Sequence, residues 1–452
     1  MRLRKTITTI VATAILLAGW QLFAVIANQP ELIPSLPRLV RTLCEWLVSG
    51  SFYQSVGATI FRGILGMSIS FVCAIGMAGL FARFEWVYEL FRPLLAIMRS
   101  IPVISFILLA LIFLNPESIP LMIAFLTMFP LLTENLTRGI LDLRPGLSIM
   151  ARQFHIKRSN VLFQIIYPQL KPFLYSGLAS AAGFGWRAII MGEVLSQCAF
   201  GIGSEMKRAQ NFIAVPELLA WTIVAVFISF FFDKGISKVA DITPKISFAN
   251  EDQTIPTPTL SVLDTKDISY QYGIQHFSHS FQKGIIYGIS APSGKGKTTL
   301  LNLIGGILLP TKGEIHPTRH FGIATIFQQP QLLPHLTAEE NIILPLSSFL
   351  TEEKARRIAQ KHLQEMEMEP FGNRYPKELS YGQQQRIAIA RALASPSPLL
   401  LMDEPFKGLD EALSHRIIER IREKQMKEER IILFTSHNPD EIRLLADEVI
   451  YL

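Results

Sequence analysis

Six apolar runs fill most of the first 240 residues, and each is close to the length that crosses a lipid bilayer as a helix. A helix needs roughly 20 mostly apolar residues to span the hydrocarbon core. The second and third runs could also be buried core helices, but five or six such runs within 240 residues favour membrane spans. The sequence therefore predicts an α-helical membrane domain of about six transmembrane helices, near residues 6–27, 57–82, 94–114, 118–134, 172–197 and 214–232.

Basic residues give the orientation of these spans. The first run follows Arg2, Arg4 and Lys5, a start that also fits a signal peptide, although the length of the run and the further runs favour a membrane span. The positive-inside rule places this start in the cytoplasm, together with the basic connection between the fourth and fifth spans. Six spans then return the chain to the cytoplasm near Asp233. The connection carries Arg138, Arg144, Arg152, Lys157, Arg158 and Lys171.

The charge distribution indicates a lipid partner. Residues 1–240 hold 20 Lys and Arg against 11 Asp and Glu, so the basic half of the chain is also the apolar half. This combination favours contact with an anionic bilayer, and we expect no nucleic-acid partner. The three cysteines, Cys44, Cys73 and Cys198, form neither a disulfide framework nor a metal-binding spacing. We expect a multi-pass protein of the cytoplasmic (inner) membrane.

The second half contains a phosphate-binding loop. A short β-prone run, Ile285–Ile289, leads into a Gly-rich loop and then into a helical stretch, which is the context that a P-loop requires. Backbone N–H groups of such a loop face phosphates, Lys297 adds a positive charge toward the β- and γ-phosphates, and Thr298 offers a hydroxyl to Mg²⁺. The predicted ATP-binding residues here are Ala291, Pro292, Ser293, Gly294, Lys295, Gly296, Lys297, Thr298 and Thr299.

Two carboxylates end a later apolar strand, Leu399–Glu404. Asp403 is placed to hold Mg²⁺, directly or through water. Glu404 is placed to orient or activate the water that attacks the γ-phosphate. Together with the P-loop, this pair predicts an enzyme that hydrolyses ATP with Mg²⁺ as cofactor.

Between these two motifs, Leu379-Ser380-Tyr381-Gly382-Gln383 resembles the signature of ABC ATPases, with Tyr381 where the family has glycine. The resemblance covers about residues 260–452 and implies an α/β P-loop ATPase domain in which Ser380, Gly382 and Gln383 bind a γ-phosphate. The first position of the P-loop, Ala291, also departs from the usual glycine. The family's other elements follow in order, and the resemblance implies their roles. Gln328 senses Mg²⁺ and water, Gly408-Leu409-Asp410 forms the D-loop, His437 is the switch histidine, and Tyr272, with Tyr270 as the alternative, stacks on adenine.

The stretches Leu32–Ser35, Arg62…Gly66, Arg99–Pro102 and Trp186…Glu193 together resemble the permease family that serves nitrate, sulfonate, taurine and thiamine-precursor uptake. The basic connection resembles the EAA loop of binding-protein-dependent ABC permeases. Ile149-Met150-Ala151, His155 and Ile165–Pro168 follow the family spacing, with Ile149 and His155 in place of the usual Glu and Gly, and Tyr167 in place of the usual Leu. The resemblance implies a short helix that docks on the ATPase, and an extracytoplasmic substrate-binding protein as partner.

Two ionisable residues, Arg187 and Glu193, lie inside the fifth apolar run. Charged groups are costly at membrane depth, so they are either bonded to a neighbouring helix or part of a substrate path. They are six residues apart and therefore lie on different faces of one helix. Both interpretations stay open for each residue.

These elements predict three domains: a permease at residues 1–236, a linker at 237–259 and an ABC ATPase at 260–452. With one permease and one ATPase per chain, we expect a homodimer that drives the uptake of a small-molecule substrate, with its ATPase in the cytoplasm. The alternatives are an asymmetric transporter with a different partner chain and a non-transporting membrane sensor. An ABC exporter fits the short spans and the EAA-like spacing less well. A soluble ABC ATPase acting on nucleic acid or ribosomes does not fit the apolar first 240 residues.

Overall fold

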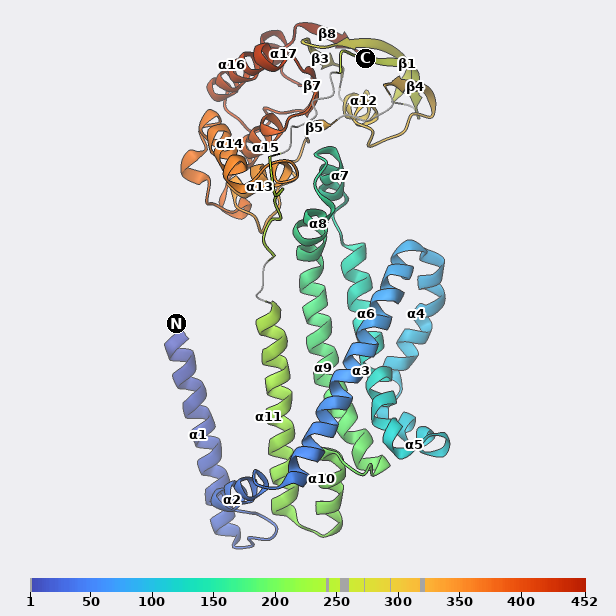
Figure 1. Cartoon of the computed structure of the whole chain (residues 1–452), viewed down its shortest axis with the longest axis vertical. Helices are drawn as coiled ribbons and strands as arrows, with labels where there is room; N and C mark the ends of the chain where they lie inside the picture. Colours follow the sequence, from blue (N-terminus) through green and yellow to red (C-terminus); the bar gives the residue numbers. More distant parts are fainter. Residues whose placement is uncertain (1, 241–243, 253–259, 272, 293, 318–321) are drawn as a thin grey trace. The chain divides into compact units, whose positions relative to one another are not determined.

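The chain folds into two compact units, and each unit is made of two separate stretches of the sequence. The computed structural model describes residues 2–240, 244–252, 260–271, 273–292, 294–317 and 322–452 (Figure 1). The first unit comprises Met1–Leu143 and Gln169–Thr243, and the second comprises Arg144–Pro168 and Pro244–Leu452. The stretch 144–168, which the sequence places between two membrane spans, therefore belongs to the second unit. We call this stretch the docking segment.

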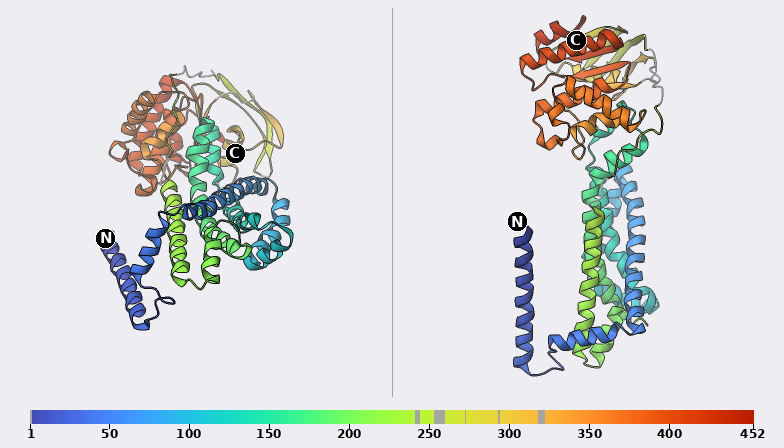
Figure 2. Two further views of the ribbon diagram at one scale, coloured as in Figure 1. Left: turned by 60° about the horizontal axis from the view of Figure 1, so that its bottom comes forward. Right: turned by 60° about the vertical axis from the view of Figure 1, so that its left-hand side comes forward.

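The first unit is entirely helical in its described part (Figure 2). Most of its helices are long and apolar, as the predicted membrane domain requires. Two short helices, α2 and α10, lie in the connections between them. The elements are α1 (Arg2–Ala27), α2 (Leu36–Trp46), α3 (Gly50–Arg83), α4 (Glu85–Ser100), α5 (Val103–Phe113), η1 (Pro116–Ser118), α6 (Ile119–Leu141), α9 (Tyr167–Ser196), α10 (Ile202–Asn211) and α11 (Val215–Ala240).

Among the described residues, four helical runs are long and apolar enough to cross a membrane: Gly50–Arg83, Pro116–Leu141, Arg158–Ser196 and Val215–Ala240. They match the second, fourth, fifth and sixth predicted spans. The first predicted span corresponds to α1, whose apolar part Val11–Ala27 is a shorter helix. The helical membrane domain is thus confirmed, with four candidate spans, or five if the bent pair described next is one span.

The third predicted span, 94–114, is not one straight helix. It is divided between α4 and α5, which bend by 94° at the break between them. Pro102 lies at this break, and the preceding residue Ile101 is extended, with φ −71° and ψ 129°. Proline disfavours helical geometry at the residue before it, so the apolar run continues while the helix does not.

Small residues allow the long helices of the first unit to pack closely. A Cβ added to Gly63 would lie 2.7 Å from the ring of Trp186, and one added to Gly66 would lie 2.7 Å from the Cβ of Ala124. Membrane helices gain little from the hydrophobic effect between them and depend on such close backbone approach. These contacts join α3 to α9 and α6.

Glu193, one of the two charges in the fifth span, is fully buried and bonded to neighbouring elements. Its carboxylate accepts hydrogen bonds from the hydroxyl of Thr59 (2.9 Å) and the backbone N–H of Gly203 (3.0 Å), and it pairs with the Nη1 of Arg62 (2.8 Å). Arg62 also binds Glu117 at 2.6 Å. For Glu193, the interpretation as a structural charge bonded to a neighbouring helix is therefore confirmed.

The second unit contains two sheets. β2, β1 and β4 form an antiparallel sheet of three strands, and β5, β6, β7, β3 and β8 form, in that order, a parallel sheet of five strands. All five residues of β6 and of β7 are buried, as expected for parallel strands covered on both faces. The strands are β1 (Val262–Tyr270), β2 (Ile274–Gln282), β3 (Ile286–Ser290), β4 (Lys312–His316), β5 (Ile323–Ile326), β6 (Leu399–Asp403), β7 (Ile431–Thr435) and β8 (Glu448–Tyr451).

Helices complete this α/β unit, which confirms the predicted fold class. The docking segment supplies α7, α8 and the π-helical turn η2, and its Leu147, Met150 and Phe154 are buried in the same hydrophobic core as β5, β6 and β7. The helical elements are α7 (Pro145–Gln153), α8 (Arg158–Asn160), η2 (Val161–Ile166), α12 (Lys297–Ile304), α13 (Ala338–Leu346), α14 (Glu352–Glu365), η3 (Glu369–Phe371), η4 (Pro376–Glu378), α15 (Tyr381–Ala394), α16 (Glu411–Glu428) and α17 (Pro439–Leu445).

We predict that Arg62→Met destabilises the protein strongly, because it leaves the buried carboxylate of Glu193 without its cation. Breaking one side of a buried ion pair costs about 3–5 kcal/mol. Thermal unfolding of the detergent-solubilised protein would measure the loss, and the double variant Arg62→Met/Glu193→Gln should recover part of it. A single variant as stable as the parent would contradict a structural role for this pair.

Candidate functional site

The phosphate-binding loop lies between β3 and α12, as predicted. Gly294 and Gly296 adopt φ values of 80° and 92°, in the region that favours glycine. A Cβ on Gly296 would also lie 2.8 Å from the carbonyl oxygen of Gly273, so this position combines a left-handed backbone with close packing. The turn ends at the N-terminus of α12, where backbone N–H groups are free to bind phosphate oxygens.

Lys297 begins α12 and is almost completely buried, with 8% of its surface exposed. Its Nζ donates a hydrogen bond to the carbonyl oxygen of Ala291 at 2.6 Å and lies 3.5 Å from the Nδ1 of His437. No carboxylate pairs with it within 4 Å in the described part of the chain. The ammonium is thus held across the loop by a neutral acceptor and is positioned to pair with an anionic ligand.

A hydroxyl and a carboxylate meet at the carboxyl ends of the parallel strands. The Oγ1 of Thr298 donates to the Oδ2 of Asp403 at 2.9 Å, and the Oγ1 of Thr435 donates to its Oδ1 at 2.8 Å. The register pairs Asp403 of β6 with Thr435 of β7, and this pairing brings residues of distant sequence together. Burial raises the pKa of the Asp403 carboxyl, and the two hydroxyls act in the opposite direction.

This pair fits Mg²⁺. At nucleotide sites Mg²⁺ is usually held by one or two protein oxygens together with phosphate oxygens and water. The described residues contain no cluster of three or more His, Cys, Asp or Glu side chains that could hold a metal ion by themselves. Thr298 and Asp403 therefore provide the kind of donor set that shares a cation with a bound phosphate.

Glu404 follows Asp403 in a left-handed conformation, with φ 49°, which turns its side chain away from the strand. Its carboxylate lies 2.9 Å from the Nε2 of His437 and 3.3 Å from the Nζ of Lys407. Burial favours a higher pKa for Glu404, but the hydrogen bond and charge of Lys407 and the contacts of His437 and Gln328 outweigh burial and lower the pKa. At neutral pH this carboxylate is therefore ionised and can accept a hydrogen bond from water.

Gln328 follows β5 and connects this site to the signature. Its side chain lies close enough to Glu404 to help lower the pKa of that carboxyl. Its carbonyl oxygen accepts a hydrogen bond of 2.7 Å from the Oη of Tyr381. The tyrosine that replaces the usual signature glycine is thus bonded to the backbone of the predicted Q-loop.

Ser380 and Gln383 form a capping box at the start of α15. The N–H of Gln383 donates to the Oγ of Ser380 at 3.3 Å, and the N–H of Ser380 donates to the Oε1 of Gln383 at 2.9 Å. Gly382 packs against the D-loop, since a Cβ on it would lie 2.6 Å from the carbonyl oxygen of Gly408. In the described structure no hydrogen bond joins these three residues to the phosphate-binding loop of the same chain.

The structure thus brings together one part of the predicted site and separates another. Lys297, Thr298, Asp403, Glu404, Gln328 and His437 form one connected cluster. Pro292, Gly294, Lys295 and Thr299 belong to the loop and to the first turn of α12, and the predicted contacts of Tyr272 and Ser293 lie outside the described residues. Thr435 and Lys407 were not predicted. Thr435 ends an apolar strand, and this position could have identified it as a site residue, whereas nothing in the sequence indicates such a role for Lys407.

The docking segment contacts two functional parts of the second unit. The Nε2 of Gln153 donates to the carbonyl oxygen of Gly305, at the end of the P-loop helix α12, at 2.6 Å. The guanidinium of Arg391, in the signature helix α15, lies 5.3 Å from the ring centre of Phe154. Arg391 also donates to the carbonyl oxygens of Pro330 and Gln331, which follow Gln328 in sequence. The segment is therefore in direct contact with the end of the P-loop helix and with the signature helix.

Asn160 fixes the other end of the docking segment. Its Nδ2 donates to the carbonyl oxygen of Ser247 (2.8 Å) and contacts the Oγ of Ser347 (2.9 Å), and its Oδ1 accepts from the N–H of Ser247 (2.8 Å). The Nε2 of Gln164, within the π-helical turn, donates to the carbonyl oxygen of Pro244 at 3.0 Å. Both amide side chains are buried, so these bonds exclude water.

The backbone conformation of His155 shows why the EAA pattern has glycine at this position. It has φ 51° and occupies the position at which the EAA pattern has glycine. A left-handed backbone is needed there, because α7 ends at Gln153 and the chain turns before α8 begins at Arg158. Glycine adopts this conformation without strain, and here histidine adopts it at some cost.

Comparisons with known proteins agree with this geometry. The family described as "ABC transporter" matches residues 274–407, and the family described as "Binding-protein-dependent transport system inner membrane component" matches residues 66–233. The "Thiamine import ATP-binding protein ThiQ" of Yersinia pseudotuberculosis is 34% identical over 205 residues, which are 42% of this chain and 86% of that protein. These matches cover the two regions that the sequence assigned to a permease and to an ATPase.

Other similar proteins match the same region. The "Fe(3+) ions import ATP-binding protein FbpC" of Rhizobium etli is 35% identical over 189 residues, 40% of this chain and 54% of that protein. The "Glucose import ATP-binding protein GlcV" of Saccharolobus solfataricus is 35% identical over 185 residues, 38% of this chain and 52% of that protein. The chain thus spans about half the length of these two curated relatives. A solved ATP-binding cassette in a dimeric state with ADP and Pi has 31% identity and a TM-score of 0.40, and the match covers 42% of this chain and 94% of that one.

We predict that Tyr381→Phe weakens the connection between the signature and the Q-loop. The change removes the hydroxyl that donates to Gln328 but keeps the ring that packs beside Gly408. A hydrogen bond of this kind contributes about 1 kcal/mol to stability. Amide hydrogen exchange should therefore be faster at residues 327–331 in the variant. Tyr375→Phe is the matched control, and equal exchange in Tyr381→Phe and the parent would contradict the prediction.

Proposed function

This chain belongs to the ABC transporter family, and on that premise we propose that it is a fused permease and ATPase that imports a small solute across the cytoplasmic membrane. One observation carries the proposal: the docking segment, which lies between two predicted membrane spans, is built into the core of the ATP-binding unit. We further propose the domain limits 1–236 for the permease, 237–259 for the linker and 260–452 for the ATPase.

We infer that each residue of the cluster has a separate role in ATP hydrolysis. The loop amides and Lys297 bind the phosphates, and Thr298 and Asp403 hold Mg²⁺, which would neutralise charge on the β- and γ-phosphates when bound. Glu404 accepts a hydrogen bond from the attacking water, which it orients toward the γ-phosphate. His437 and Gln328 hold the Glu404 carboxylate in place. The contact between Thr298 and Asp403 supports this assignment.

A second copy of the chain completes the site in this proposal. Ser380, Gly382 and Gln383 form a helix N-terminus suited to a phosphate, yet their described hydrogen bonds stay within their own helix start. A twofold dimer presents this helix start to the partner's P-loop and creates two equivalent sites. An asymmetric complex with another chain is the alternative, and the departures at Ala291 and Tyr381 are its sequence support.

The docking segment then couples hydrolysis to the permease. Gln153 contacts the end of the P-loop helix and Phe154 contacts Arg391 of the signature helix, so closure of two ATPases around ATP acts on the C-terminal end of α7. Coupling requires that ATP favour one of two arrangements of the permease. The match to binding-protein-dependent permeases supports an extracytoplasmic substrate-binding protein as partner. The relatives' names cover iron, glucose, polyamine and thiamine import, and we propose the nitrate, sulfonate, taurine or thiamine-precursor class on the permease resemblance.

We predict that Glu404→Gln lowers the rate of ATP hydrolysis by at least about 100-fold and leaves ATP binding intact. The amide keeps the size of the side chain but loses the charge that orients water. Phosphate release by the purified protein in lipid nanodiscs would measure the rate, and a fluorescent ATP analogue would measure binding. Glu423→Gln, an exposed change on α16, serves as the control. Full hydrolysis by the Glu404 variant would contradict the assignment.

We predict that Asn160→Ala leaves ATP hydrolysis largely unchanged but weakens the conformational response of the permease to ATP. The change breaks three hydrogen bonds of the docking segment but touches no residue of the phosphate site. Hydrolysis should stay within about twofold of the parent. Addition of ATP should change the rate at which maleimide labels the exposed native Cys44, and this change should be several-fold smaller in the variant than in the parent. Lys157→Ala, an exposed change in the same segment, is the control, and an unchanged labelling response in Asn160→Ala would contradict the coupling role.

A further inference from the structure

Residues 244–252 follow α11 and lie within the proposed linker, yet they are part of the second compact unit. The side chains of Ile246 and Phe248 are partly buried and pack against the hydrophobic core that also contains the docking segment. The backbone N–H of Ala249 donates to the carbonyl oxygen of Ser347 at 3.0 Å. In a free tether, water would bind such backbone groups instead. We call residues 244–252 the strap.

Two amide side chains of the docking segment bind the backbone of the strap. Asn160 donates to the carbonyl oxygen of Ser247 and accepts from its N–H, both at 2.8 Å. Gln164 donates to the carbonyl oxygen of Pro244 at 3.0 Å. Both amide side chains are fully buried, so breaking these bonds would leave buried polar atoms unpaired, which is costly. The strap and the docking segment are therefore held together as one piece.

Asp252 attaches the other end of the strap to the start of α14. Its Oδ1 accepts hydrogen bonds from the backbone N–H and the hydroxyl of Thr351, each at 3.0 Å, and its Oδ2 lies 3.5 Å from the Nζ of Lys354. Thr351 is the N-cap residue of α14, and its own side chain makes no capping hydrogen bond. A carboxylate is favourable there, because it faces the positive end of the helix dipole. The strap is thus attached to the second unit at both of its ends.

The strap begins only a few residues after the end of α11. The helix ends at Ala240 and the strap begins at Pro244, so even a fully extended chain between these two residues reaches only about 14 Å. A connection this short has little slack. A displacement of the strap that exceeds this slack acts on α11, whereas a long flexible linker would absorb it.

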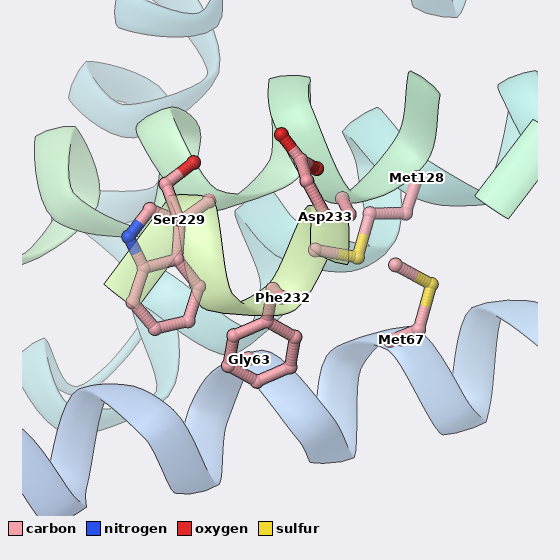
Figure 3. A pocket seen from close by; sticks show the side chains of 8 residues that line it. Gly63, Met67, Met128, Ser229, Phe232 and Asp233 are labelled. Atoms are coloured by element: carbon pink, nitrogen blue, oxygen red, sulfur yellow. The ribbon is translucent and has the colours of Figure 1, made fainter. Parts of the chain in front are cut away.

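The end of α11 that precedes the strap is packed into the first unit. The ring of Phe232 lies with its centre 5.2 Å from that of the buried Trp186 on α9. A small pocket beside this contact is lined by residues of four helices, among them Met67 of α3, Met128 of α6 and Asp233 of α11 (Figure 3). A displacement of α11 therefore changes its packing against the other predicted spans.

Resting on the proposed function, we propose that the strap is a second coupling element, which transmits the nucleotide state of the ATPase to α11 as the docking segment transmits it to α9. Because buried hydrogen bonds join the two elements, they move as one piece, and the fifth and sixth predicted spans respond together. A linker that served only as a tether would raise the local concentration of the two domains and transmit no displacement.

The same flexible insertion at two positions separates this role from that of a tether. The sequence Gly-Ser-Gly-Ser-Gly-Ser between residues 242 and 243 lengthens the connection between α11 and the strap. The same sequence between residues 256 and 257 lengthens the linker after the strap and is the matched control. Both proteins and the parent carry Cys73→Ser and Cys198→Ser, so that Cys44 is the one remaining cysteine.

Three measurements are made on each protein in lipid nanodiscs. Phosphate release gives the rate of ATP hydrolysis. The effect of ATP on the rate of maleimide labelling of Cys44 gives the response of the permease. Cys44 is exposed on α2, which packs on α11 through the stacked rings of Trp46 and Trp221, whose centres are 4.5 Å apart. Amide hydrogen exchange at residues 246–249 shows whether the strap stays in place.

We expect the insertion after residue 242 to reduce the effect of ATP on Cys44 labelling at least about threefold, because flexible chain absorbs the displacement. The insertion after residue 256 should leave this effect unchanged. Hydrolysis and slow exchange in the strap should persist in both proteins, since neither insertion touches the phosphate site or the contacts of the strap.

Several results would overturn the proposal. A labelling response equal to that of the parent in both insertion proteins would show that the linker is only a tether, and an equal loss in both would show that the position of the strap does not matter. Fast exchange at residues 246–249 of the parent would show that the strap is not part of the ATPase unit. A parent protein that does not hydrolyse ATP would instead refute the proposed function on which the strap's role rests.

Discussion

The proposed coupling between ATP hydrolysis and the permease depends on one interaction, the packing of the docking segment into the hydrophobic core of the α/β unit. Leu147, Met150 and Phe154 are each at most 2% exposed, and burial of such side chains contributes roughly 1.5–3 kcal/mol each. The segment continues directly into the predicted fifth span, because residues Arg158–Ser196 form one helical run. A chain built in this way cannot change the shape of its nucleotide unit around α7 without affecting the helix that follows. The π-helical turn at Val161–Ile166 lies in that helix, between the docked part and the apolar part.

The phosphate site shows how one sheet edge can give two adjacent carboxylates different properties. Asp403 is the last residue of β6 and remains between two hydroxyls, where burial raises its pKa. Glu404 leaves the strand with a left-handed backbone and reaches Lys407 and His437, whose charges and hydrogen bonds help to lower its pKa. The change in backbone conformation between two neighbouring residues therefore gives the two carboxylates different neighbours, as the different roles proposed for them require. The same sheet edge places the ammonium of Lys297 beside the ring of His437.

Much of this architecture could be predicted from the sequence, because the motifs are local. The strand, Gly-rich loop and helix around Lys297 are contiguous, and the apolar runs of the membrane half have lengths that few other structures require. The bend between α4 and α5 was not predicted, since an apolar run looks continuous even where Pro102 ends helical geometry. The partner of Glu193 could not be predicted either, because Arg62 is 131 residues away and only the packing of α3 on α9 brings them together. The hydroxyl of Tyr381 finds an acceptor at Gln328, 53 residues away, which explains how a bulky residue is accommodated in the signature.

Amide hydrogen exchange of residues 144–168 in the intact protein, in lipid nanodiscs, tests the central claim most directly. If the docking segment is part of the nucleotide unit, the amides of α7 should exchange as slowly as those of the buried strand β6, because both belong to one hydrophobic core. Addition of ATP and Mg²⁺ to a hydrolysis-deficient variant should then alter exchange in α7 and in the π-helical turn together. Exchange in α7 as fast as that of an exposed loop, and indifferent to nucleotide, would contradict the account.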